Sequence, residues 1–105
     1  MKDEDEIYKA LYDASEKGDV ANLRSTIDKI PTDQRARLLS KANTSDNFEK
    51  TPLHIAVGNG HTECLRMLVI GGADIDKEDK YGQTPMHWAA GNGHTECVKK
   101  FGAGC

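Results

Sequence analysis

Apolar residues recur three and four positions apart in several short stretches of this chain, and glycines interrupt the pattern between them. One such stretch contains Cys64, Leu65, Leu68 and Val69, an apolar stripe that predicts a short amphipathic helix. Two consecutive glycines follow this stripe at positions 71 and 72, where a helix of this kind is expected to end. The pattern therefore predicts short helices joined by tight turns.

The same pattern occurs twice in the sequence. The stretch from Thr51 to Cys64 returns almost unchanged from Thr84 to Cys97, 33 residues later and without a gap. Thr84 is expected to cap a helix whose first residue is Pro85, because proline has no N–H to leave unpaired at that position. The glycines at positions 91 and 93 end this helix, and a second helix begins at about residue 94. Each copy thus predicts a helix-turn-helix unit, and such a repeat predicts a stack in which each unit buries its apolar face on the next.

A weaker copy precedes these two. Residues 11–19 match residues 53–61 at a leucine, an alanine and a glycine, although 42 residues separate the two stretches. The nine additional residues are placed within residues 29–40, where Pro31 predicts a helix start and a short extra helix over Thr32 to Leu39. The more polar composition of this first copy is typical of a repeat that caps one end of a stack.

Three linked motifs resemble those of a known family. They are Thr-Pro-Leu-His-x-Ala from Thr51, Gly-His-x-Glu from Gly60 and Gly-Ala-Asp from Gly72. In this order and at this period, residues 41–98 resemble ankyrin repeats. The resemblance implies an all-α solenoid of stacked helix-turn-helix repeats with β-hairpin loops, formed as a single domain over residues 1–105. We assign residues 6–40 to an N-terminal capping repeat, 46–78 to a second repeat and 79–105 to a shortened third.

The predicted loops before the two clear copies align with each other, and Phe48 aligns with Tyr81. Glu49 departs from the pattern, because the aligned position in the second loop is Gly82. Glycine adopts the turn conformations that other residues resist, so the tightness of the first turn is where we expect the two loops to differ.

The last predicted helix is truncated, since Gly102 stands where the preceding copy has Val69. Two full repeats and a shortened third make a marginal array, because about three repeats are usually needed for stability. We expect the C-terminal face either to be covered by a second copy of the chain, in a self-association, or to fray. The alternative is that the chain is a fragment or isoform of a larger ankyrin protein.

Composition and charge exclude several classes. The chain has 105 residues, 37% of them hydrophobic and 30% charged, which predicts one small soluble domain. A net charge of −3 gives no electrostatic footprint for nucleic acid, and the longest apolar stretch, residues 65–75, is too short and interrupted to span a membrane. Three cysteines without a framework spacing and the lack of a secretory signal indicate a reducing compartment, so we expect a cytoplasmic or nuclear location.

Histidine and cysteine recur at ligand-like spacing, as His61-x-x-Cys64 and again as His94-x-x-Cys97. A metal ion needs its ligands within about 2.3 Å, whereas aligned residues in a stack are separated by one inter-repeat step. We therefore expect no metal, no cofactor and no catalysis, and a His/Cys metal protein or enzyme is the alternative interpretation. The resemblance implies that His54 and its aligned histidine form structural hydrogen bonds between neighbouring loops.

The resemblance also implies a function, since ankyrin-like arrays bind other proteins on a concave surface formed by the loops and first helices. We expect a non-catalytic protein-interaction module (an adaptor, scaffold or regulator) with exposed aromatic anchors at Phe48 and Tyr81. Trp88 is expected to pack in the core. The positions that carry over as partner-binding are Glu16, Lys17, Ser45, Asn47, Phe48, Lys50, Asn59, Glu78, Lys80, Tyr81, Gln83 and Asn92.

Overall fold

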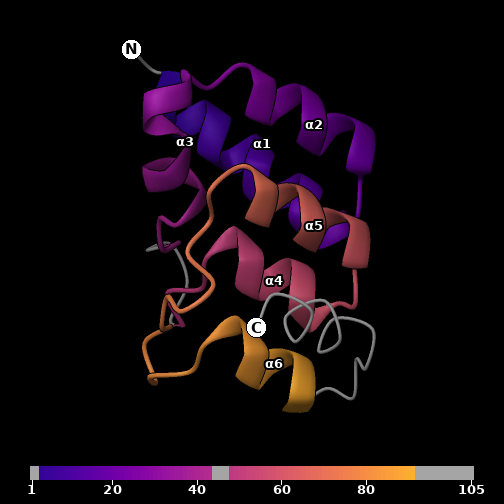
Figure 1. Cartoon of the computed structure of the whole chain (residues 1–105), viewed down its shortest axis with the longest axis vertical. Coiled ribbons are helices and arrows are strands. Elements are labelled where there is room, and N and C mark those ends of the chain that lie inside the picture. The colour runs from indigo at the N-terminus through magenta and orange to yellow at the C-terminus, as the bar shows by residue number, and fades with distance from the viewer. Residues whose placement is uncertain (1–2, 44–47, 92–105) are drawn as a thin grey trace.

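The computed structural model describes residues 3–43 and 48–91, and six α-helices lie within them (Figure 1). Their bounds are α1 Asp3–Lys17, α2 Val20–Asp28, α3 Thr32–Leu39, α4 Pro52–Gly58, α5 Thr62–Ile70 and α6 Pro85–Gly91. No strand occurs in the described residues, so the predicted all-α class is confirmed. The boundaries assigned to the three repeats stay predictions, although α1 begins at Asp3, ahead of the start at residue 6 expected for the first repeat.

The helices form two layers. In one layer α1, α4 and α6 follow one another along the long axis of the molecule, and in the other α2 packs beside α5 (Figure 1). Within a repeat, α1 packs on α2 and α4 packs on α5. This is the stack that the repeated pattern predicts, because each helix pair covers the apolar face of the next.

Fully buried leucines hold the stack together. Leu11 in α1 and Leu53 in α4 are both completely buried, which agrees with the alignment of the weak first copy with the second. Leu23 in α2 and Leu68 in α5 are also completely buried and belong to the same core cluster. Cys64 lies in this cluster as a free thiol, so its predicted role as a small buried apolar residue is confirmed.

The extra helix α3 has the predicted bounds and packs against α1, beside the first repeat (Figure 1). Leu39 at its C-terminus is completely buried and lies over the end of α5. A Cβ at Gly71 would come within 2.7 Å of the Leu39 side chain, so this close approach depends on glycine. On the surface, Arg37 of α3 forms an ion pair with Glu4 of α1 at 2.9 Å.

The two loops are turns closed by isolated backbone hydrogen bonds. The Asp79 N–H donates to the Gln83 carbonyl at 2.9 Å, and the Lys80 N–H donates to the Phe48 carbonyl at 2.8 Å, which joins the tips of the two loops. The expected hairpin of the second loop is therefore present as a turn, and these bonds are too few to form a strand in the described residues. Residues 44–47 of the first loop lie outside the described residues.

Glu49 has a positive φ angle, like the glycine with which it aligns. Its φ angle is 53°, and that of Gly82 is 77°, both in the left-handed region. A residue with a Cβ is disfavoured in this region, so the backbone is strained at Glu49 and not at Gly82. The tightness of the first turn stays a prediction, because residues 44–47 lie outside the described residues.

Candidate protein-interaction surface

His54 and Thr51 form a reciprocal pair at the start of α4. The His54 N–H donates to Thr51 Oγ1 at 3.2 Å, and the Thr51 N–H donates to His54 Nδ1 at 3.2 Å. Because Nδ1 accepts this bond, the proton of the neutral ring is on Nε2, which donates to the Gln83 carbonyl at 2.8 Å. The structural hydrogen bond implied for His54 is confirmed, since this bond joins the second repeat to the loop of the third.

The His54 ring is held in its neutral form. The residue is completely buried, and this burial lowers the pKa of His54 below the ordinary value of histidine. The Gln83 carbonyl and the Asp79 carboxylate act in the opposite direction but do not overcome the burial, and Lys50 adds to the lowering. His54 is therefore a structural hydrogen-bonding residue, with both ring nitrogens engaged.

Asp79 organises the second loop from within. Its Oδ1 accepts hydrogen bonds from the backbone N–H groups of Tyr81 and Gln83, each at 2.9 Å, and its Oδ2 accepts from the Trp88 indole at 3.0 Å. Burial raises the pKa of Asp79, but these three donors outweigh it, and the pKa lies below the ordinary value of aspartate. The ionised carboxylate thus fixes Tyr81 and Trp88 relative to each other.

An aromatic cluster with one cation lies where the two loops meet α6. The rings of Phe48 and Tyr81 lie 5.7 Å apart, and the two residues are 45% and 63% exposed. The Lys50 ammonium lies 5.5 Å from the Phe48 ring centre and 5.1 Å from that of Trp88. We call Phe48, Lys50, Tyr81 and Trp88 the loop-tip cluster.

Trp88 packs against the core without being part of it. It is half-buried and packs against the core cluster, with its ring set edge-on to His54 at 6.0 Å. The core packing expected for Trp88 is therefore only partly realised, because the side chain remains partly exposed.

Two of the predicted partner-binding residues lie at a contact between repeats. The Asn59 side chain donates to the Glu16 carbonyl at 3.1 Å, and His61 Nε2 lies 3.1 Å from the same oxygen. Lys17 forms an ion pair with Asp13 on α1. The structure therefore uses Asn59 to join the repeats, and it leaves the Glu16 side chain exposed.

Three further predicted positions, Glu78, Lys80 and Gln83, are exposed on the second loop beside the loop-tip cluster. The structure thus brings Phe48, Lys50, Lys80 and Tyr81 together, as the predicted surface requires. The predicted residues Ser45, Asn47 and Asn92, together with His94, Cys97 and the C-terminal face, lie outside the described residues.

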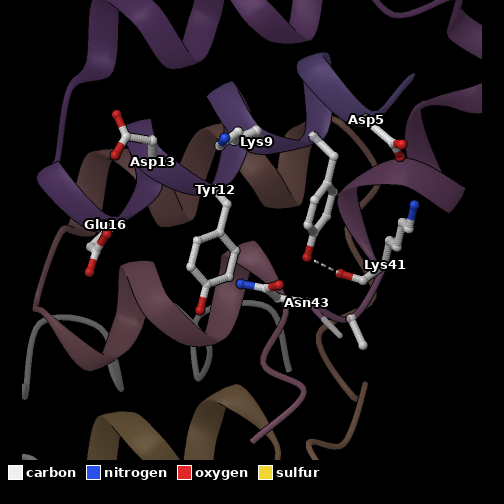
Figure 2. A pocket seen from close by; sticks show the side chains of 9 residues that line it. Asp5, Lys9, Tyr12, Asp13, Glu16, Lys41 and Asn43 are labelled. Carbon is white, nitrogen blue, oxygen red and sulfur yellow. Dashed lines mark hydrogen bonds between the residues drawn. The ribbon is translucent and has the colours of Figure 1, made fainter. Parts of the chain in front are cut away.

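A groove on the exposed face of α1 extends the candidate surface. It has a volume of about 560 Å³, and Figure 2 shows the side chains that line it. The lining residues are Asp5, Tyr8, Lys9, Tyr12, Asp13, Glu16, Lys41, Ala42 and Asn43. We call this the α1 groove. At its edge the Asn43 N–H donates to the Lys50 carbonyl at 2.7 Å, so the α1 groove adjoins the loop-tip cluster.

Of these lining residues, sequence reasoning selected only Glu16. The first copy lacks the Thr-Pro motif, so the family positions could be carried over to just two of its residues. The missed signal is the spacing of Tyr8 and Tyr12, four residues apart and therefore neighbours on one helix face. Their rings lie 6.1 Å apart, and the Tyr8 hydroxyl donates to the Lys41 carbonyl at 2.6 Å, as Figure 2 shows.

The histidine and cysteine positions do not gather within the described part of the chain. Among residues 3–43 and 48–91, no three His, Cys, Asp or Glu side chains form a group that could hold a metal ion. Burial raises the pKa of the Cys64 thiol, which keeps it protonated in the core. Residues 3–43 and 48–91 also include no helix with the length and apolarity needed to cross a membrane.

The comparison with known families agrees with this geometry. The family model described as ankyrin repeats, in three copies, matches residues 11–103. The chain therefore belongs to the ankyrin-repeat family, whose members are generally non-catalytic protein-interaction modules. A search of curated proteins finds no match for this chain.

Proposed function

We propose that this protein is an adaptor, scaffold or regulator that binds one partner protein across the loop-tip cluster and the α1 groove. The observation that carries the proposal is the exposed Phe48–Tyr81 pair, because large aromatic side chains contribute strongly to protein–protein binding. Single exposed apolar residues are ordinary, but two aromatic rings in contact at the tips of adjoining loops form a concentrated apolar contact area.

The support beneath the pair favours tight binding. Tyr81 is fixed through its backbone N–H to Asp79, and Phe48 through its carbonyl to the Lys80 N–H. Groups that are already ordered lose less conformational entropy on association, so pre-organisation of this kind increases affinity.

A binding role fits the histidines better than a catalytic one. The ring nitrogens of His54 are both used in structural hydrogen bonds, and its lowered pKa reflects burial rather than a reactive partner. The buried free thiol of Cys64 is compatible with a reducing compartment, and we propose that the protein acts in the cytoplasm or the nucleus. The expected self-association concerns the C-terminal face, which the described residues do not include.

Affinity capture with a matched control tests the proposal. The bait is the full chain as wild type, as Phe48→Ala/Tyr81→Ala, or as Val69→Ala/Ile70→Ala. The control pair is also apolar and exposed, at 40% and 80%, but it lies on α5 in the other helix layer. We expect a partner to be retained by wild type and by the control and lost from the aromatic variant. Equal retention by all three baits contradicts the proposed surface.

A further inference from the structure

The charges of the α1 groove are divided between groups that already have ionic partners and groups that do not. Asp13 is paired with Lys17 at 3.2 Å. The Lys41 ammonium lies 3.9 Å from Glu4 and 5.3 Å from the centre of the Tyr8 ring. These groups are engaged within the protein, so they do not determine what the groove attracts.

Two carboxylates in the α1 groove remain available. Glu16 and Asp5 are both exposed, and neither carboxylate has an ion-pair partner among the described residues. Glu16 is anchored through its backbone carbonyl to Asn59 and His61, so its position is fixed although its side chain is not paired. Lys9 lies between the two carboxylates along α1, and Figure 2 shows Lys41 on the side of Asp5, so the Glu16 end of the groove is the more negative one.

Tyr12 stands beside Glu16. The two are four residues apart in α1, so their side chains are neighbours on one helix face, and Figure 2 shows both in the groove. A tyrosine ring attracts a cation over its face, and a guanidinium group can stack on the ring while it pairs with a carboxylate. The Tyr12–Glu16 corner therefore has the chemistry that an arginine side chain requires.

We propose that the α1 groove binds an extended segment of the partner protein, with an arginine of that segment against Tyr12 and Glu16. This inference rests on the proposed function and names the chemistry of its partner. Asp5 and Glu16 are separated along the helix by about 16 Å, at 1.5 Å per residue. An extended segment rises about 3.3 Å per residue, so a second basic residue about five positions away reaches Asp5.

Titration of the ¹⁵N-labelled protein with synthetic peptides tests this inference. The probes are acetyl-Arg-Ala-Ser-Ala-Ser-Arg-amide and the same peptide with glutamate in place of both arginines. We expect the arginine peptide, at millimolar concentration and low salt, to shift the amide signals of Tyr12 and Glu16, and the glutamate peptide to leave them in place. Equal shifts with both peptides, or no shifts with either, overturn the inference.

Two variants test whether the arginine peptide binds at Tyr12 and Glu16. Glu16→Gln keeps the shape of the side chain and removes its charge. We expect it to lower the affinity for the arginine peptide about threefold, which is the effect expected from the loss of an exposed ion pair. Asp28→Asn is the matched control, because Asp28 is an exposed carboxylate on α2, outside the groove, and has no ion-pair partner among the described residues. Equal weakening by the two variants shows a general charge effect and overturns the inference. If partner capture depends on Phe48 and Tyr81 but the arginine peptide does not bind, the proposed function is supported and only this inference is overturned.

Discussion

The His54 ring donates from Nε2 to the carbonyl of Gln83 at 2.8 Å, and this one bond joins the first helix of the second repeat to the loop of the third. The same ring accepts from the Thr51 N–H, so a single buried side chain both caps α4 and positions the loop that carries Tyr81. Stability and the shape of the binding surface are thus linked through His54.

Replacement of His54 by alanine is expected to lower the free energy of unfolding by about 2–4 kcal/mol, because it leaves a cavity, removes the α4 cap partner and removes one of the two hydrogen bonds that the Gln83 carbonyl accepts, the other coming from the Asp79 N–H. Urea denaturation followed by circular dichroism measures the change. His87→Ala is the matched control, since His87 makes the same bonds to Thr84 but is exposed. A loss for His54→Ala no larger than that for His87→Ala contradicts the role assigned to the inter-loop bond.

Stability is expected to fall as the pH is lowered through the range in which free histidine titrates. The pKa of His54 is lower in the folded state than the value of about 6.5 in the unfolded chain, so the unfolded state binds more protons between the two values. The contribution of His54 is therefore fully present above pH about 6.5 and is lost as the pH falls below it. The pKa of Asp79, whose carboxylate acts on the ring, is lowered, so this group remains ionised in this range.

Urea midpoints between pH 7.5 and pH 5.5 measure this dependence for wild type and for His54→Gln. We expect a clear decline for wild type and a flatter profile for the variant, which has no ring to protonate. A variant that declines as steeply as wild type assigns the pH dependence to other groups.

Glu49→Gly is expected to stabilise the protein by up to about 1 kcal/mol, because glycine adopts a positive φ angle without strain. This gain exceeds the free-energy cost that arises because glycine loses more conformational entropy on folding. Gly82→Ala, at the aligned position with a φ of 77°, is expected to destabilise it by a similar amount. Thermal melting measures whether Glu49→Gly raises and Gly82→Ala lowers the melting temperature relative to wild type. A lower melting temperature for Glu49→Gly contradicts the strain assigned to Glu49.

Gly18→Ala is expected to destabilise the contact between the first two repeats by about 1–3 kcal/mol. Gly18 has a φ of 74°, and a Cβ there would lie 2.7 Å from Nδ1 of His61. Removal of the histidine ring relieves the clash but not the backbone strain, so His61→Ala should recover part of the loss in the double variant. A double-mutant cycle measures this recovery, and strictly additive losses would refute the contact.

The sequence predicted the elements whose cause is local or periodic. The start of α3 followed from Pro31, and the burial of Cys64, Leu65 and Leu68 followed from helical spacing within a repeat, although Val69 of the same stripe is exposed. The role of His54 came from the family motif rather than from spacing. These features depend on residues near one another in the chain or at a fixed period.

The features that the sequence did not predict depend on contacts between repeats. The Glu16 carbonyl accepts from Asn59, and His61 contacts the same oxygen. Because every residue has a backbone carbonyl, the sequence does not show which one accepts a side-chain hydrogen bond. The strain at Glu49 exists because the turn imposes its shape on a residue with a Cβ, a tertiary effect that outweighs local preference. The α1 groove was missed because the first copy is too divergent for its positions to be carried over.

The most direct test of the account is to map the bound partner on the labelled chain. Once a partner is captured, its addition to the ¹⁵N-labelled protein should shift or broaden the amide signals of Phe48, Tyr81 and Tyr12 and leave those of α2 and α5 unchanged. Signal changes confined to α2 and α5, with the loop-tip cluster and the α1 groove unaffected, would contradict it.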